Sequence, residues 1–200
     1  MIDKTDFEFL DIPDTGQSDD DNLKREISEL SKSGYQLLKD DNIVDAEVTF
    51  KKILEKDPEN NYAFVGLGDA ERKKRNYRTA IEYYQKCLEK YPDNNYALFG
   101  LADCYKSLNQ YKLAIAIWEQ YLKHDDKNIT VLTRIADAYR KVRNFSKSKE
   151  IYLKVLDMDE ENAYAIIGLG HLHFDFRFYD DAQYYLKKML DKDERVDIRV

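Results

Sequence analysis

The chain has 200 residues, with 32 Lys and Arg against 39 Asp and Glu, and a formal net charge of −7. The segment 1–22 holds eight acidic side chains and one lysine, so the remainder is close to neutral and lacks the basic patch of a nucleic-acid-binding protein. No apolar run reaches the ~18 residues of a transmembrane helix. Because the acidic start has no apolar segment typical of a secretory signal, we expect a cytoplasmic protein.

Residues 1–22 differ in composition from the rest of the chain, with no helical period and with Pro13 and Gly16. High charge and few apolar residues predict an extended tail. Two interpretations stay open for Phe7–Ile12, which mixes apolar and acidic residues: part of an unstructured leader, or a short segment that docks on a partner or on the chain itself. Residues 19–22 are acidic or polar and suit the cap of a first helix.

The rest of the chain repeats with a fixed period. Residues 61–94 align with residues 95–128 without a gap, and the frame extends in both directions. The five copies span 27–60, 61–94, 95–128, 129–162 and 163–196. Apolar positions within each copy follow helical spacing, with a polar break at positions 14 to 16. The predicted helices are 23–40, 43–56, 61–74, 77–90, 95–108, 111–124, 129–142, 145–158, 163–176 and 179–192.

Small and large residues alternate at fixed positions, which indicates close helix packing. Position 8 is small in every copy: Gly34, Gly68, Ala102, Ala136 and Gly170. Position 20 is also small: Ala46, Ala80, Ala114, Ser148 and Ala182. Position 24 is large, and we expect it to fill the gap to the next pair: Phe50, Tyr84, Trp118, Tyr152 and Leu186. We therefore predict a tight helix crossing at Gly68 and Ala80.

These positions resemble the tetratricopeptide repeat. The second copy carries the family pattern in Leu67-Gly68, Ala80, Tyr84 and Pro92, whereas the third has Asp126 in place of the proline. The resemblance implies an all-α fold: a right-handed α-solenoid of five helix-turn-helix repeats over residues 23–196. The acidic tail 1–22 precedes it, and a short tail, 197–200, comes after it.

The resemblance also implies a concave groove lined by positions 2, 5, 9, 12 and 13 of the first helices. The protein-binding residues would then be Tyr62, Val65, Asp69, Arg72, Lys73, Tyr96, Phe99, Asp103, Lys106, Asp137, Arg140, Lys141 and His171. For the aspartates two interpretations stay open, because each is spaced to pair with a cation three or four residues on and each also suits contact with a ligand. The clamp that some family members use for chaperone C-termini is not expected, since only Arg134 fits it.

No catalytic, cofactor or metal site is expected. Cys87 and Cys104 are too few for a disulfide framework, and we interpret them as reduced buried residues rather than a redox pair. His171 and His173 are two apart on a helix, whereas paired metal ligands stand three or four positions apart. Glycine pairs lie inside predicted helices, where they serve packing.

The function implied is a non-enzymatic adaptor that binds a peptide or helix of another protein. Two alternatives remain: the non-catalytic repeat part of a larger enzyme or secretion assembly, and a self-associating structural array. Helix 179–192 leaves apolar side chains such as Leu186 and Met189 without a following capping helix. We therefore expect that end to be covered by a partner, by a second copy in a homo-oligomer, by further residues of the natural protein, or by the acidic tail.

Overall fold

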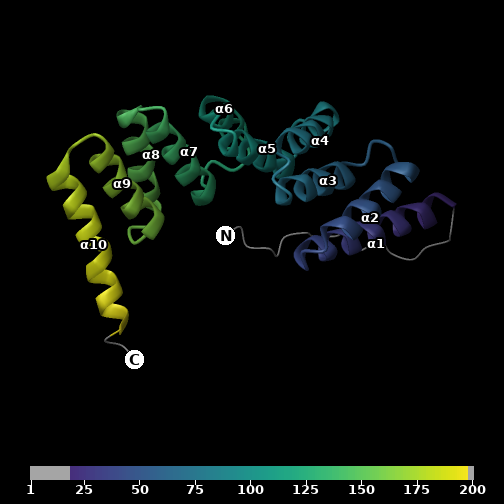
Figure 1. Ribbon diagram of the computed structural model, residues 1–200, viewed down its shortest axis with the longest axis horizontal. Coiled ribbons are helices and arrows are strands. Elements are labelled where there is room, and N and C mark those ends of the chain that lie inside the picture. Colours follow the sequence, from purple (N-terminus) through teal and green to yellow (C-terminus); the bar gives the residue numbers. More distant parts are fainter. Residues whose placement is uncertain (1–18, 198–200) are drawn as a thin grey trace. The chain divides into compact units, whose positions relative to one another are not determined.

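The computed structural model describes residues 19–197, with side chains for residues 20–190. These residues form helices and no strand, which confirms the predicted all-α helical repeat solenoid (Figure 1). The helices are α1 Asp19–Lys39, α2 Ile43–Lys56, α3 Asn61–Lys73, α4 Tyr77–Lys90, α5 Asn95–Ser107, α6 Tyr111–Tyr121, α7 Ile129–Lys141, α8 Phe145–Met158, α9 Ala163–Asp175 and α10 Tyr179–Asp197. The predictions for residues 1–18, Phe7–Ile12 included, and for residues 198–200 lie outside the described residues.

Three helices differ from the sequence prediction by more than one residue at an end, and α3, α5, α7 and α9 end one residue earlier than predicted. Helix α1 begins at Asp19 rather than residue 23, because its acidic first turn suits a helix N-terminus and Asp20 pairs with Lys24 at 2.6 Å. Helix α10 continues to Asp197 rather than 192. Helix α6 ends at Tyr121 rather than 124, because the amides of Lys123 and His124 bond three residues back, as in a 3₁₀ turn.

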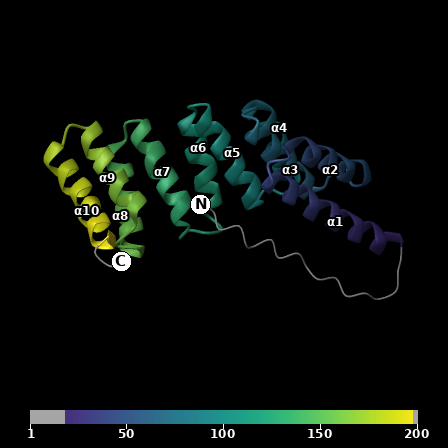
Figure 2. The ribbon, with the colours of Figure 1, turned by 60° about the horizontal axis from the view of Figure 1, so that its bottom comes forward.

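The chain divides into two compact units, residues 1–108 and 109–200, and the division falls inside the third copy. In unit 1, consecutive helices α1 to α5 pack together, and α3 also contacts α1 and α5. In unit 2, consecutive helices α6 to α10 pack together, and α7 also contacts α9. Figure 2 shows α7 to α10 side by side. A single array over 23–196 stays a prediction.

The first helix of the second to fifth copies is capped by an asparagine that ends the preceding copy. The side-chain oxygens of Asn60, Asn94, Asn128 and Asn162 accept hydrogen bonds from the backbone amide three residues on, at 2.9–3.1 Å. Such a cap satisfies one of the free N–H groups of the first turn. The cap therefore fixes where α3, α5, α7 and α9 begin.

The turn inside each repeat uses a left-handed residue that is never glycine. Asp41, Arg75, Asn109, Arg143 and Arg177 all have φ between 59° and 66°, and they occupy the same position in successive copies. In the second copy, the amide of Asn76 then bonds the carbonyl of Glu71 at 2.9 Å, which closes a Schellman-type end on α3. The repeated conformation reverses the chain from first to second helix.

In unit 1, the large residue predicted at position 24 is an aromatic ring held between two glycines. In unit 1 the buried Tyr84 ring lies against Gly68 of its own copy and against Gly100 of the next, where a Cβ atom has no room. Phe50 packs in the same way on Gly34 and Gly66. Ala80 is fully buried, which agrees with the predicted close crossing.

Candidate functional site

In unit 1, the predicted groove residues of α3 and α5 share one face of each helix, because positions 2, 5, 9, 12 and 13 fall within one helical stripe. We call the surface formed by these positions the first-helix face. Helices α3 and α5 pack against each other, so their stripes adjoin. Tyr62 and Tyr96 are 42% and 47% exposed, whereas Val65 is 3% exposed and packs beneath the surface. Aromatic side chains thus form one edge of this face.

Asp69 is held in place by two neighbours. Its Oδ1 atom accepts a hydrogen bond of 2.7 Å from the Tyr84 hydroxyl and one of 2.9 Å from the Arg72 guanidinium. The Arg72 Nε atom also donates to the Tyr84 oxygen at 3.2 Å. Among the described residues, the side-chain hydrogen bonds of Asp69 fall on Oδ1, and the side chain keeps 28% of its surface exposed. The Asp69 carboxylate is therefore held in place while its side chain stays partly exposed.

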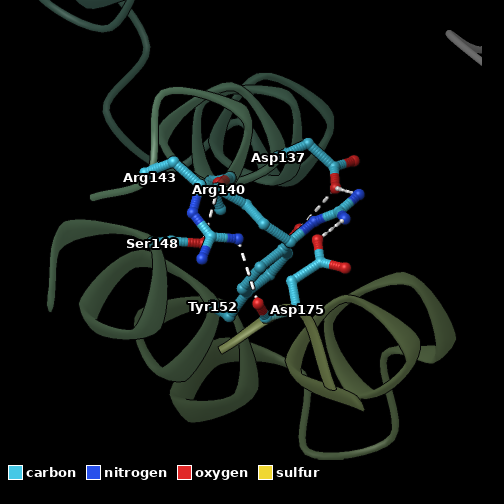
Figure 3. A network of polar contacts seen from close by, with 7 residues as sticks. Asp137, Arg140, Arg143, Ser148, Tyr152 and Asp175 are labelled. Atoms are coloured by element: carbon cyan, nitrogen blue, oxygen red, sulfur yellow. Dashed lines mark hydrogen bonds and ion pairs between the residues drawn. The ribbon is translucent and has the colours of Figure 1, made fainter. Parts of the chain in front are cut away.

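Unit 2 repeats this arrangement with the same residue types at the same repeat positions (Figure 3). The Tyr152 hydroxyl donates to Asp137 Oδ1 at 2.7 Å, and Arg140 donates to the same atom at 3.3 Å. The Asp137 side chain is 48% exposed, and Arg140 only 12%. The sequence therefore builds the same carboxylate support twice, once in the second copy and once in the fourth.

Arg140 also ties its repeat to the following one. Its other terminal nitrogen donates to Asp175 Oδ2 at 2.5 Å, and Arg143 donates to the Asp175 backbone carbonyl at 3.0 Å (Figure 3). Nearby, the buried Ser148 hydroxyl donates to the Ala136 carbonyl at 2.8 Å. Within unit 2 this network fixes the end of α7 against that of α9.

Burial sets the protonation of these groups. Burial, followed by the charge of Asp69, raises the pKa of Tyr84 well above its ordinary value, so its hydroxyl stays a donor. Burial and then Asp137 raise the pKa of Tyr152 in the same way. Burial lowers the pKa of Arg72, but the charges of Asp69 and Tyr84 and the hydrogen bonds to both residues together outweigh burial, and the pKa rises. The two tyrosines and Arg72 therefore stay protonated and act as donors in these networks.

The other predicted residues have varied surroundings. Lys73 pairs with Asp41 of the preceding copy at 2.9 Å, whereas Lys141 and His171 are exposed on unit 2. Phe99, Asp103 and Lys106 are half-buried on α5. The site residues predicted from the sequence do not include Tyr84, Tyr152 or Asp175. A hydroxyl at position 24, combined with an aspartate at position 9 of the same copy, was the signal available for the two tyrosines.

The two cysteines and His173 are buried, whereas His171 is exposed at position 9 of the fifth copy. Cys87 and Cys104 are free and buried, and burial raises their pKa values to about 11 and about 12. The buried His173 ring lies 2.7 Å from the Leu169 carbonyl and stacks on Tyr185, whereas His171 is exposed. Within residues 19–197, no helix has the length and apolar character needed to cross a membrane.

Comparisons with known proteins agree on the repeat. Residues 34–95, 71–137 and 129–162 each match a family model described as tetratricopeptide repeat. No curated protein matches the chain in sequence.

Solved structures with the same fold are distant in sequence. A tetratricopeptide repeat protein from Parabacteroides merdae is 20% identical with a TM-score of 0.78, over 86% of this chain and 68% of that one. MamA from Desulfovibrio magneticus RS-1 is 17% identical with a TM-score of 0.79, over 85% and 96%. At this identity the likeness shows the fold alone. Together with the family matches over residues 34–162 and the regularly repeated helix pairs, it shows that the chain belongs to the tetratricopeptide repeat family.

Proposed function

We propose that the protein is a non-enzymatic scaffold whose first-helix face binds an extended peptide or a helix of another protein. Tetratricopeptide repeats are in general protein-interaction modules without catalytic function, and this supports the broad assignment. The proposal that the first-helix face binds the partner rests on the way Asp69 and Asp137 are held. In both, Oδ1 is fixed by a tyrosine and an arginine while the side chain stays partly exposed.

The chemistry of this support favours a partner with hydrogen-bond donors. A carboxylate oxygen accepts from peptide N–H groups or from Lys and Arg side chains and donates nothing. Because the tyrosine and the arginine already hold the carboxylate, a partner orders fewer side chains on binding, which favours affinity. Asp69 therefore favours partners that offer N–H donors. Its side chain is already ordered in the folded protein before the partner binds.

Aromatic residues beside the carboxylates supply apolar contact. Tyr62 and Tyr96 lie in the first turns of α3 and α5 on the same face as Asp69 and Asp103, and both rings are nearly half exposed. Tyrosine is enriched among residues that dominate binding energy at interfaces. In unit 1 we assign recognition to these four residues, with Phe99, Arg72, Lys73 and Lys106 flanking them and Val65 packing below. Unit 2 contributes a second surface through Asp137, Arg140, Lys141 and His171.

A capture experiment with two charge-reversal variants tests the proposal. Proteins retained from a lysate by the wild type are identified by mass spectrometry, and the affinity of each is then measured by calorimetry. Asp103→Lys replaces an acceptor on the first-helix face, whereas Glu82→Lys makes the same change on the exposed face of α4. We expect Asp103→Lys to weaken binding by roughly tenfold or more and Glu82→Lys to leave it unchanged.

Thermal melts of both variants separate lost binding from lost folding. A partner that binds Asp103→Lys as tightly as wild type, and loses affinity for Glu82→Lys, would place recognition on the second helices and overturn the assignment.

A further inference from the structure

The exposed face of α10 is acidic in its first turn and basic two turns later. Asp180 and Asp181 stand in the first turn, Lys187 and Lys188 two turns later, and Tyr184 midway between them. The spacing i, i+1, i+4, i+7 and i+8 places all five on one side of a helix. All four charged side chains are exposed, and Tyr184 is 63% exposed.

These charges are too far apart to neutralise one another within one helix. Asp180 and Lys187 are separated by two helical turns, which is about 10 Å along the axis, whereas paired side chains on a helix stand three or four positions apart. Within the part of unit 2 that the structure describes, ion pairs join other side chains, such as Arg140 to Asp175 and Lys147 to Glu150. The α10 face therefore presents an acidic pair and a separate basic pair to its surroundings.

We propose that this face binds a second copy of the chain, with two α10 helices antiparallel about a two-fold axis at Tyr184. Such an axis brings residue 184 − n opposite residue 184 + n of the other chain. The acidic pair Asp180 and Asp181 then faces the basic pair Lys187 and Lys188 of the second copy, twice in each dimer. The two Tyr184 rings meet at the centre. A two-fold contact of this kind requires a self-complementary surface, and α10 has one.

The corresponding helix of the first copy provides a comparison. Helix α2 has lysines at the same repeat positions, Lys51 and Lys52, and both are exposed. At the positions of the two acidic residues, however, it has Val44 and Asp45, and Asp45 accepts a hydrogen bond from Asn42 at 2.6 Å. The complete acidic pair, basic pair and central tyrosine therefore belong to α10. The contact is small and charged, which is typical of a weak, reversible, salt-sensitive dimer.

Two charge-reversal variants of the full chain test the inference by sedimentation equilibrium. Asp180→Lys with Asp181→Lys makes the face entirely positive, and Lys187→Asp with Lys188→Asp makes it entirely negative. Wild type should form dimers that weaken as salt is raised. Each variant alone should dimerise at least roughly tenfold more weakly than wild type, because like charges then face each other. An equimolar mixture should regain dimers, because opposite faces meet again.

Lys51→Asp with Lys52→Asp makes the same charge change on α2 and should dimerise as wild type does. Circular dichroism checks that each variant remains helical. A wild type that is monomeric at all concentrations overturns the inference, and so do variants that dimerise like wild type or a mixture that stays monomeric. The binding proposal for the first-helix face does not depend on this result.

Discussion

At the scale of single residues, the protein repeats one solution for holding a carboxylate. Asp69 and Asp137 each accept from a tyrosine at position 24 and an arginine at position 12 of their own repeats. The third copy has Lys106 and Trp118 at these positions. The tyrosine is shared between core and surface, because its ring fills the junction while its hydroxyl reaches the first-helix face.

Removing the Tyr84 hydroxyl should therefore lower the free energy of unfolding, although the tyrosine ring stays in place. Tyr84→Phe keeps the ring but deprives Asp69 of its 2.7 Å donor, and we expect a loss of about 1–2 kcal/mol in the free energy of unfolding. Urea denaturation measures this loss. Tyr111→Phe is the control, since the Tyr111 hydroxyl donates to Asn109 at an exposed site. Equal effects of the two substitutions would contradict the role given to the buried hydroxyl.

At the scale of elements, every repeat reverses direction through a strained residue. Non-glycine residues in the left-handed region are unfavourable by about 1–2 kcal/mol each, and this chain has one such residue in each of its five turns. The Schellman-type hydrogen bonds of the turn offset that cost in the folded state.

Glycine at such a turn should stabilise the protein. Arg75 is exposed with φ of 63°, and Arg75→Gly should raise the free energy of unfolding by about 0.5–1 kcal/mol, since glycine adopts this conformation without steric cost. Thermal or urea melts give the value. Glu82→Gly, inside α4, should instead lower the free energy by about 1 kcal/mol. If both glycine substitutions lower the free energy of unfolding, strain at the turn does not determine the effect of Arg75→Gly on stability.

At the scale of the whole molecule, the two compact units have separate sets of packed helices. Within each unit, helices contact their neighbours along the chain and, for several of them, the helix two places away, so the effect of a substitution on stability should stay close to its site. This locality arises because, within each unit, the packed helices are close together in the sequence.

A single overpacked junction should therefore loosen one unit more than the other. In Gly168→Ala the new methyl group meets the buried Tyr152 ring, and we expect a loss of about 1–3 kcal/mol. Native-state hydrogen exchange should show lower protection in α7 to α10 than in wild type, with α1 to α4 little changed. A uniform fall in protection along the chain would mean that the units unfold as one.

The repeat, the helix pairs and the small and large core positions could all be predicted from the amino-acid order, because a fixed period constrains all copies at once. The bounds of α2, α4 and α8 agree with the prediction. A left-handed turn residue comes shortly before each of these helices and an Asn cap follows it, which leaves little freedom in where the helix begins and ends. The same pattern put Asp69 and Asp137 on the first helices, but it left their pairing open. Packing then brought Tyr84 and Tyr152 to these carboxylates and buried Val65, because those contacts join different helices. Burial and contact between helices depend on how the helices pack, and spacing within a single helix does not specify that.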